Sequence, residues 1–339
     1  MKAIKVENPN VIHIVDIPFP KNIDENEVMI KVKAAGICGS DLHIIHGRSP
    51  VAVYPRIIGH EVAGEVVKVG VKVDRLKEKD HVVVDPVISC GKCYACLMGR
   101  PNVCFSLQVR GVHVDGGFCE YIVVPEDSVH KISNEIIWEE AALVEPFTVA
   151  AQVVSRGNIS KLDSVLILGA GPAGLSILQV VKNIGSKCFV VDINDRRLEL
   201  AKKMGADVVI NSKNQDLSHT VLKETDGLGT NVIIEAVGLP RLLEESMKII
   251  SPAGRIVVMG FIDEPSKINE LDITKKEISI MGSRLHSKKF PEVIEWFDKK
   301  LVNPKSLISH VFNFTDIYKA LELLEGKNEQ VCKVILKWD

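Results

Sequence analysis

The chain has 339 residues, 46% hydrophobic and 25% charged, and 42 basic residues nearly balance 44 acidic ones. This length suits two domains, and the composition is that of an ordinary globular protein. The net charge of −2 gives no electrostatic basis for binding nucleic acid or an anionic membrane. The most apolar stretch, 165–181, is interrupted by glycine and proline, so we interpret it as a strand and a helix, not as a membrane span.

The chain contains eight cysteines, and its first residues lack the apolar run of a signal peptide. In a chain of this size these features favour metal ligands and reduced thiols over disulfides. We therefore expect a cytoplasmic protein.

Short alternating strands separated by proline and asparagine clusters dominate the first part of the chain. The expected strands are 2–6, 11–15, 28–34, 62–69, 81–87 and 117–124. This all-β pattern with long loops places the polar candidates described below in loops or at strand ends, where chemistry is usually located.

From about residue 140 the hydrophobic period changes. A helix is expected over 138–154, and strands then alternate with apolar helices. The expected strands are 164–168, 187–191, 206–210, 231–236, 254–259 and 278–282. Strands of this kind predict a parallel sheet covered by helices on both faces.

The tail carries expected helices at 290–300 and 315–325 and a strand at 332–337. We assign it to the first domain. The predicted domains are therefore 1–150 completed by 285–339, and an inserted nucleotide domain, 151–284.

Four cysteines lie within fifteen residues in the pattern C-x2-C-x2-C-x7-C. They are Cys90, Cys93, Cys96 and Cys104. Four thiolates at this spacing can surround one tetrahedral ion, which predicts a closed structural zinc site. The alternative, a zinc ribbon that binds nucleic acid, would need surrounding basic and aromatic residues, and few are present.

A second group of polar residues spans Gly36–Glu61. It comprises Cys38, Ser40, His43, His60 and Glu61. Cys, His and Glu are zinc ligands, and mixed sets are typical of catalytic zinc. Spacing alone does not show that they converge, and a buried cysteine with an N-capping histidine is the alternative interpretation.

The stretch Gly169-Ala-Gly171-Pro172-Ala173-Gly174 follows an apolar strand and opens an apolar helix. This G-x-G-x-x-G pattern predicts a turn whose backbone approaches a pyrophosphate at a helix N-terminus. Asp192 lies 18 residues beyond Gly174, where a carboxylate can hold the adenosine ribose and repel a 2′-phosphate. NAD is therefore favoured over NADP, although Arg196 and Arg197 nearby could tolerate a phosphate.

The stretch Gly59-His60-Glu61-x-x-Gly64-x5-Gly70-x-x-Val73, with Cys38 and Ser40 before it and the cysteine cluster and glycine loop after it, resembles the zinc-dependent medium-chain alcohol dehydrogenases. The resemblance covers essentially the whole chain. It implies a GroES-like catalytic domain plus a doubly wound parallel Rossmann sheet (α/β and β), with the active site in the cleft between them. It also implies two zinc ions, NAD, and a homodimer or homotetramer.

The same resemblance implies roles for individual residues. Cys38, His60 and Glu61 would be the catalytic zinc ligands, and Ser40 and His43 would pass the substrate proton to solvent. Where ethanol-oxidising members have a cysteine, this chain has Glu145 in a Glu-Pro pattern similar to sorbitol and threonine dehydrogenases. Glu145 would approach the metal directly or through water. The expected reaction is oxidation of a secondary hydroxyl.

Two stretches, around Tyr54-Pro-Arg56 and Ser283-Arg284, resemble dehydrogenases that act on L-galactonate or L-gulonate at C5. A guanidinium can pair bidentately with a sugar-acid carboxylate. Substrate candidates are Tyr54 and Arg284, with Arg56 and His46 weaker. Further cofactor candidates are Arg197, Val237, Ser283 and Arg284.

Several alternatives stay open at this point. The substrate could be sorbitol or another polyol, butanediol, or L-threonine oxidised at C3. A zinc-independent quinone reductase of the same superfamily would lack Cys38, His60 and the cysteine cluster. A nucleotide-binding sensor without turnover would not need Ser40 or His43.

Overall fold

The computed structural model describes residues 1–326 and 331–338, and the chain forms two compact units. The first unit joins residues 1–146 to the chain from Ser287 onward, and the second is Phe147–His286. The second unit is therefore an insertion in the first. The corresponding predicted boundaries follow residues 150 and 284. Residues 327–330 and 339 of the predicted tail lie outside the described residues.

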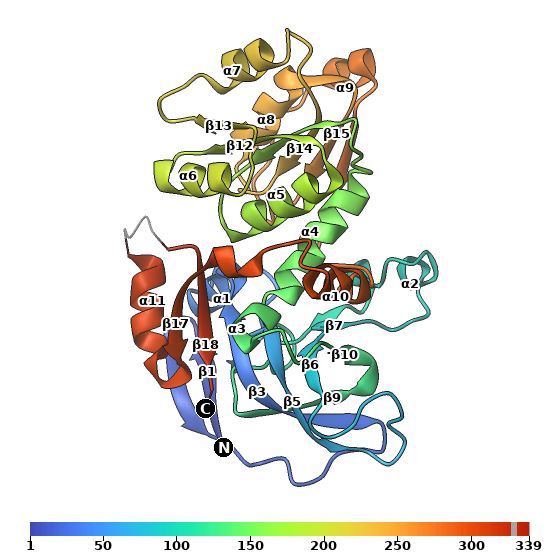
Figure 1. Ribbon diagram of the computed structural model, residues 1–339, viewed down its shortest axis with the longest axis vertical. Helices are drawn as coiled ribbons and strands as arrows, with labels where there is room; N and C mark the ends of the chain where they lie inside the picture. The colour runs from blue at the N-terminus through green and yellow to red at the C-terminus, as the bar shows by residue number, and fades with distance from the viewer. Residues whose placement is uncertain (327–330, 339) are drawn as a thin grey trace. The chain divides into compact units, whose positions relative to one another are not determined.

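The first unit is built around the long strand β3 (Glu27–Ile37), which pairs with three other strands (Figure 1). Its main sheet runs in the order β10 (Val129–Lys131), β6 (His81–Val84), β5 (Glu61–Val69), β3, β18 (Lys333–Lys337) and β17 (Ile308–Asn313), with β9 (Tyr121–Pro125) also paired to β3. Smaller sheets join β1 (Lys2–Asn8) to β2 (Val11–Asp16) and β4 (Arg56–Ile57), and β7 (Val87–Ile88) to β8 (Gln108–Val109). Alternating buried residues of these strands make one apolar core.

Short helices connect the strands of the first unit. The α-helices are α1 (Gly39–Ile45), α2 (Tyr94–Leu97), α3 (Trp138–Ala141), α10 (Phe290–Asp298) and α11 (Ile317–Glu325). The 3₁₀ turns are η1 (Pro101–Val103), η2 (Glu126–Ser128), η3 (Pro304–Leu307) and η4 (Phe314–Asp316). Helix α4 (Val144–Arg156) contains the point where the chain passes from the first unit to the second.

The second unit is a parallel sheet with its first strand in the middle (Figure 1). The order is β13 (Val208–Asn211), β12 (Lys187–Asp192), β11 (Ser164–Leu168), β14 (Thr230–Glu235), β15 (Ile250–Val258) and β16 (Ser279–Gly282). Its helices are α5 (Pro172–Ile184), α6 (Asp195–Lys203), α7 (Leu217–Glu224), α8 (Pro240–Ile249) and α9 (Glu270–Lys276). This is the doubly wound order that binds dinucleotides at the carboxyl edge of the sheet.

Both faces of the parallel sheet are covered. Leu166 and Leu168 pack in one cluster with Leu217 of α7 and Met247 of α8. On the other face, the side chain of Ile167 lies against Gly174 of α5. This explains why the sheet strands read as continuous apolar runs, as was predicted.

Three expected elements differ from the structure because of proline or close packing. The helix expected over 138–154 is broken between α3 and α4, since Pro146 has no N–H to donate into the preceding turn. The strand expected over 81–87 ends at Val84, next to Pro86. Strand β9 starts only at Tyr121, because Gly116 packs against the backbone of Gly59, which precedes β5, and Gly117 packs against the side chain of Val62.

Strand β17 was not predicted, and its residues are half-buried or exposed without a clear alternation. Within the described ranges, 1–326 and 331–338, we find no helix with the length and apolar character needed to span a bilayer.

Candidate functional site

The pairing of β3 with β5 brings the first group of candidate ligands together. Gly36 lies opposite Glu61 in this antiparallel pair, so the end of β3 meets the start of β5. Cys38 follows β3 directly, and His60 immediately precedes β5. As a result, one potential ligand atom each from Cys38, His60 and Glu61 lie within 4.8 Å of one another.

The three side chains, of which Cys38 is half-buried and the other two are buried, form a site that suits a divalent cation. His60 and Glu61 are 7% and 1% exposed. Oε2 of Glu61 is buried without a hydrogen-bond partner in the described part of the chain. An unpaired buried carboxylate oxygen is costly unless a cation or donor meets it. A thiolate, an imidazole and a carboxylate are a ligand set typical of catalytic zinc.

Asp41 belongs to this site, and the sequence analysis missed it. Its carboxylate is fully buried and accepts hydrogen bonds from the backbone N–H of Cys38 (2.9 Å) and of Gly59 (3.3 Å). Its Oδ1 lies 3.5 Å from Nδ1 of His60. Burial disfavours a charged imidazole, but Asp41 and then Cys38 outweigh it and raise the pKa of His60 well above its usual value. Such a carboxylate behind a ligand histidine orients the ring.

A signal for Asp41 was present in the sequence, because it is the third residue of a helix that begins after Cys38. Lys333 gave no such signal, since it lies 272 positions from its partner Glu61. Its Nζ lies 2.5 Å from Oε1 of Glu61, and both side chains are almost fully buried. Burial lowers the pKa of Lys333, but Glu61 and then Cys38 outweigh burial and raise it.

The three other predicted catalytic residues lie in different environments. Oγ of Ser40 is 3.4 Å from Nε2 of His60, so Ser40 borders the metal ligands. His43 is exposed at the end of α1, and partial burial, then Arg48, lower its pKa. Glu145 is buried in the first turn of α4 but is not one of the three residues whose ligand atoms converge. A contact between Glu145 and the metal stays a prediction.

Of the predicted substrate residues in the first unit, two are engaged elsewhere. Nη1 of Arg56 pairs with Asp115 at 3.1 Å, and Nε2 of His46 pairs with Glu325 at 2.6 Å. Both side chains are therefore engaged by neighbouring carboxylates, and we no longer favour either for a substrate carboxylate. The hydroxyl of Tyr54 donates to a backbone carbonyl of α1, so it retains only its acceptor capacity for a ligand.

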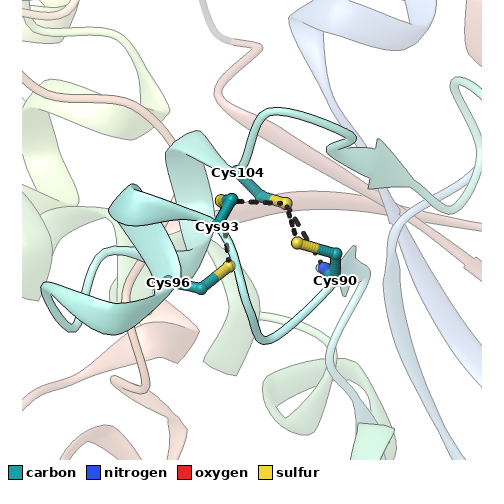
Figure 2. A group of neighbouring side chains, drawn as sticks. All are labelled: Cys90, Cys93, Cys96 and Cys104. Carbon is teal, nitrogen blue, oxygen red and sulfur yellow. Dashed lines mark hydrogen bonds between the residues drawn. The ribbon is translucent and has the colours of Figure 1, made fainter.

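The four clustered cysteines face a common centre (Figure 2). Their sulfur atoms are 3.6 Å apart for Cys93 and Cys96, 3.8 Å for Cys93 and Cys104, and 3.4 Å for Cys104 and Cys90. These distances are far too long for disulfides. They are close to the edge of roughly 3.8 Å that four Zn–S bonds of about 2.3 Å give in a tetrahedron. The backbone N–H of Lys92, then that of Cys93, lowers the pKa of Cys90, which favours the thiolate.

The segment that carries these cysteines has almost no apolar core of its own. Tyr94 is 80% exposed, Leu97 75% and Phe105 96%. Its helices α2 and η1 are only four and three residues long, too short to be stable alone. A metal ion bound by the four thiolates would therefore stabilise this segment.

Replacement of one cluster cysteine tests this interpretation. We expect Cys93→Ser to lower the zinc content from about two ions per chain to about one, because three thiolates hold the structural ion poorly. Elemental analysis of the purified variant measures this directly. Cys188→Ser, which changes a buried thiol of the parallel sheet, is the control and should keep both ions. A Cys93→Ser protein with two tightly held zinc ions would contradict the assignment.

The glycine loop of the second unit has the geometry of a phosphate-binding turn. Gly169 has a φ of +107°, which favours glycine. A Cβ on Gly174 would lie 1.9 Å from the carbonyl oxygen of Gly169, so α5 packs closely on the turn. In contrast, a Cβ on Gly171 would meet nothing within 4 Å. Gly171 is the N-cap of α5, followed by Pro172 and Ala173, so open space remains where an anion can reach the helix N-terminus.

Asp192 ends β12 beside this turn, as predicted. Its Oδ2 accepts a hydrogen bond from the N–H of Ala170 (2.8 Å), and its Oδ1 accepts from the N–H groups of Ile193 (2.8 Å) and Asn194 (3.0 Å). Nη1 of Arg197 lies 3.9 Å from Oδ2. Asp192 is therefore fixed in position by three backbone donors, with lone pairs left for ribose hydroxyls.

The remaining cofactor candidates follow the carboxyl ends of β14 and β16. A methyl group of Val237 lies against Gly169, and the N–H of Val237 donates to Oε1 of the buried Glu235 (2.9 Å). Oγ of Ser283 is buried and has no partner within the described ranges. The guanidinium of Arg284 lies 4.9 Å from the centre of the Phe261 ring, and burial lowers its pKa. These residues line the same edge of the sheet as Asp192 and the glycine loop.

Comparison with known proteins identifies the family. Residues 24–134 match the alcohol dehydrogenase GroES-like domain, and residues 172–299 match the zinc-binding dehydrogenase domain. The chain therefore belongs to the zinc-binding medium-chain alcohol dehydrogenases. This confirms the predicted family, its fold class, and its enzyme class, an oxidoreductase that uses zinc and a nicotinamide dinucleotide.

Individual relatives cover nearly the full length of the chain. The starvation-sensing protein RspB of Escherichia coli K12 is 46% identical, with 99% of each chain covered. The crystal structure of RspB from E. coli CFT073 in complex with NADH gives a TM-score of 0.95 at 45% identity, covering 100% of this chain and 99% of that one. L-Threonine 3-dehydrogenase of Pyrococcus horikoshii is 40% identical (94% and 92% covered), and L-galactonate-5-dehydrogenase of E. coli K12 is 31% identical (95% and 94% covered).

Proposed function

We propose that this protein oxidises a secondary hydroxyl of a sugar acid or polyol and transfers the hydride to NAD, with an L-galactonate or L-gulonate 5-dehydrogenase activity as the specific candidate. The convergence of Cys38, His60 and Glu61 beside Ser40 carries the proposal. The similarity to L-galactonate-5-dehydrogenase supports the sugar-acid substrate, and the similarity to RspB in complex with NADH supports the choice of cofactor.

The metal ligands, Ser40 and His43 would each have a separate role in such a reaction. A zinc ion held by Cys38, His60 and Glu61 would polarise the substrate hydroxyl and lower its pKa, while NAD would accept the hydride. Ser40 is positioned beside these ligands to accept the proton of that hydroxyl. His43 is exposed and its pKa is lowered, so its imidazole is neutral near pH 7 and can accept the proton from the site and release it to solvent.

The cofactor half of the proposal depends on the second unit. Gly171 and Ala173 would place backbone N–H groups and the positive end of α5 at the pyrophosphate, and Asp192 would hold the adenosine ribose. Pro172 has no N–H to offer and would instead fix the backbone at the start of α5 beside the pyrophosphate. Arg284 is our candidate for a substrate carboxylate, since its guanidinium lies at this edge of the sheet, over the ring of Phe261, and can pair with a carboxylate through two N–H groups.

A substrate screen tests the proposal. Purified protein with NAD should reduce the cofactor with L-galactonate or L-gulonate faster than with sorbitol, other hexitols, pentitols, butanediol or L-threonine, measured as absorbance at the NADH band. Pre-treatment with a chelator should remove the activity and added zinc should restore it. If L-threonine alone were oxidised, the protein would instead be an L-threonine 3-dehydrogenase. This second candidate is supported by the 40% identity to an L-threonine 3-dehydrogenase. Chelator-insensitive activity would contradict the proposed role of the metal.

Replacement of Asp192 tests the choice of cofactor. We expect Asp192→Ala to raise the KM for NAD about 10- to 100-fold, because a charge-assisted hydrogen bond contributes about 1.5–3 kcal/mol. The preference of the Asp192→Ala variant for NAD over NADP should fall at the same time. Steady-state kinetics with both cofactors measures the effect. Asp216→Ala, which removes the carboxylate that caps α7, is the matched control and should leave the NAD-to-NADP ratio unchanged. A wild-type preference for NADP would contradict our assignment.

We further propose that the enzyme works in a reducing compartment such as the cytoplasm and that it forms a homodimer or homotetramer. The eight free cysteines support the first statement, since four of them are needed as reduced thiols by the metal-binding cluster. The resemblance to the oligomeric dehydrogenases supports the second, which sedimentation or light scattering can test.

A further inference from the structure

The buried contact between Lys333 and Glu61 has a more specific meaning for the metal centre, and the inference drawn from it rests on the proposed function. Lys333 begins β18, which pairs with β3 so that Val334 lies opposite Ile37. The strand pairing therefore places the Lys333 ammonium group next to the Glu61 carboxylate of the metal-ligand cluster. Lys333 is 3% exposed and Glu61 is 1% exposed, so neither charge is solvated by bulk water.

The two oxygens of the Glu61 carboxylate lie in different environments. Oε1 accepts from Nζ of Lys333 at 2.5 Å. Oε2 is buried and has no partner among the described residues, and a ligand oxygen of Glu61 lies within 4.8 Å of the ligand atoms of Cys38 and His60. The carboxylate is thus held by one oxygen and free at the other.

Gly36 closes the space around this carboxylate. A Cβ at Gly36 would lie 1.9 Å from Oε2 of Glu61 and 3.0 Å from Cε of Lys333. The Glu61 carboxylate therefore packs against the β3 backbone on one side and against the Lys333 stem on the other. While Lys333 is in place, Oε1 of Glu61 is occupied by its ammonium group, and Oε2 is the oxygen without a partner among the described residues.

The charges around the site also indicate that Lys333 affects metal binding. A metal ion would meet the thiolate of Cys38 and the carboxylate of Glu61, with the charge of Asp41 behind His60. Lys333 is the cation that lies against this group in the described structure. A buried positive charge so close to a divalent ion weakens the binding of that ion, while it stabilises the carboxylate in its absence.

We propose that Lys333 is a positioning residue of the metal centre: it holds Oε1 of Glu61, leaves only Oε2 for the metal, and keeps the bound ion exchangeable. In this arrangement Glu61 contributes one oxygen and does not close the coordination sphere with two. An open position for the substrate hydroxyl is what a catalytic zinc site requires.

The test measures metal binding without turnover. In Lys333→Met, both oxygens of Glu61 become available and the repelling charge is lost. We expect zinc to leave the catalytic site for a chelator about tenfold more slowly, within the 10- to 100-fold range typical of outer-shell partners. In the cobalt-substituted enzyme, the visible d–d absorption should weaken as the coordination number rises. Lys333→Arg keeps the charge and should restore the wild-type rate and spectrum. Release from the four-cysteine site is the internal reference and should not change.

Two further variants make the result decisive. Lys333→Gln keeps a donor for Oε1 but removes the charge, so it tests the charge effect even if Lys333→Met does not fold; slower release is expected here too. In a Glu61→Gln background, Lys333→Gln should slow release less than it does beside the native Glu61, because the part of the effect that acts through the carboxylate is gone while the loss of the charge remains. Wild-type release and spectrum in Lys333→Gln, or an equal effect with and without Glu61, would overturn the proposal. Neither readout needs a substrate, so a wrong substrate assignment would leave this test unaffected.

Discussion

His60→Ala is expected to abolish dehydrogenase activity, with kcat/KM reduced by about 10³-fold or more. The metal contributes several kcal/mol by stabilising charge on the substrate oxygen, and a loss of about 4 kcal/mol corresponds to this factor. His60 is buried beside Cys38 and Glu61, and its replacement by alanine removes one of the three ligands that converge there. Activity should be measured together with zinc content.

The zinc content separates this explanation from simple unfolding. His60→Ala should lose one zinc ion and keep the ion of the four-cysteine cluster, which is formed by a different part of the first unit. His310→Ala, in the half-buried strand β17, is the matched control and should keep both ions and its activity. Normal turnover by His60→Ala with a single zinc ion would show that the cluster at Cys38 and Glu61 is not the catalytic centre.

Gly174→Ala is expected to weaken NAD binding at least about 100-fold and to destabilise the second unit. The added methyl group would lie 1.9 Å from the carbonyl oxygen of Gly169, and that atom is backbone and cannot move aside alone. Helix α5 must therefore shift away from the turn, which misplaces the N–H groups meant for the pyrophosphate. Overpacking of this kind typically costs about 1–3 kcal/mol of stability. Calorimetric titration with NAD and thermal unfolding measure the two effects.

Gly171→Ala provides the matched comparison. Its methyl group would meet no atom within 4 Å, and Gly171 has a φ of −72°, which alanine adopts without strain. This variant should keep wild-type thermal stability but bind NAD more weakly, because the methyl group occupies the space open to the pyrophosphate. If both variants bound NAD as the wild type does, the glycine loop would not be the dinucleotide site.

The parallel sheet and its glycine loop were predictable because their signals are local. The strands are short apolar runs, and the turn from Gly169 to Gly174 sits directly between one strand and one helix. The cysteine cluster was predictable for the same reason, since its four ligands lie within one short segment. Proline positions explain most of the boundary errors, because a missing N–H breaks a helix or strand that the hydrophobic pattern alone would continue.

The metal centre was only partly predictable, because it is made by pairing between distant strands. Cys38 and His60 could be proposed from residue type and resemblance, but their convergence depends on the register of β3 and β5. Asp41 was missed although its place as third residue of the helix after Cys38 was a signal for a capping role, since its contact with His60 depends on the fold. Lys333 could not be found from the sequence, because one lysine among many becomes significant only through burial beside Glu61.

The insertion of the second unit sets the order in which the ribosome supplies the parts of the metal centre. Cys38, His60 and Glu61 are synthesised early, whereas Lys333 follows 272 positions after Glu61. At a translation speed of roughly 5–20 residues per second, this gap corresponds to about 15–50 s. During that interval the nascent chain carries the three ligands with no lysine against the carboxylate. Under the proposed role of Lys333, an ion bound at this stage by paired β3 and β5 would meet a more strongly anionic site than the finished enzyme offers, and the addition of β18 would make that ion exchangeable.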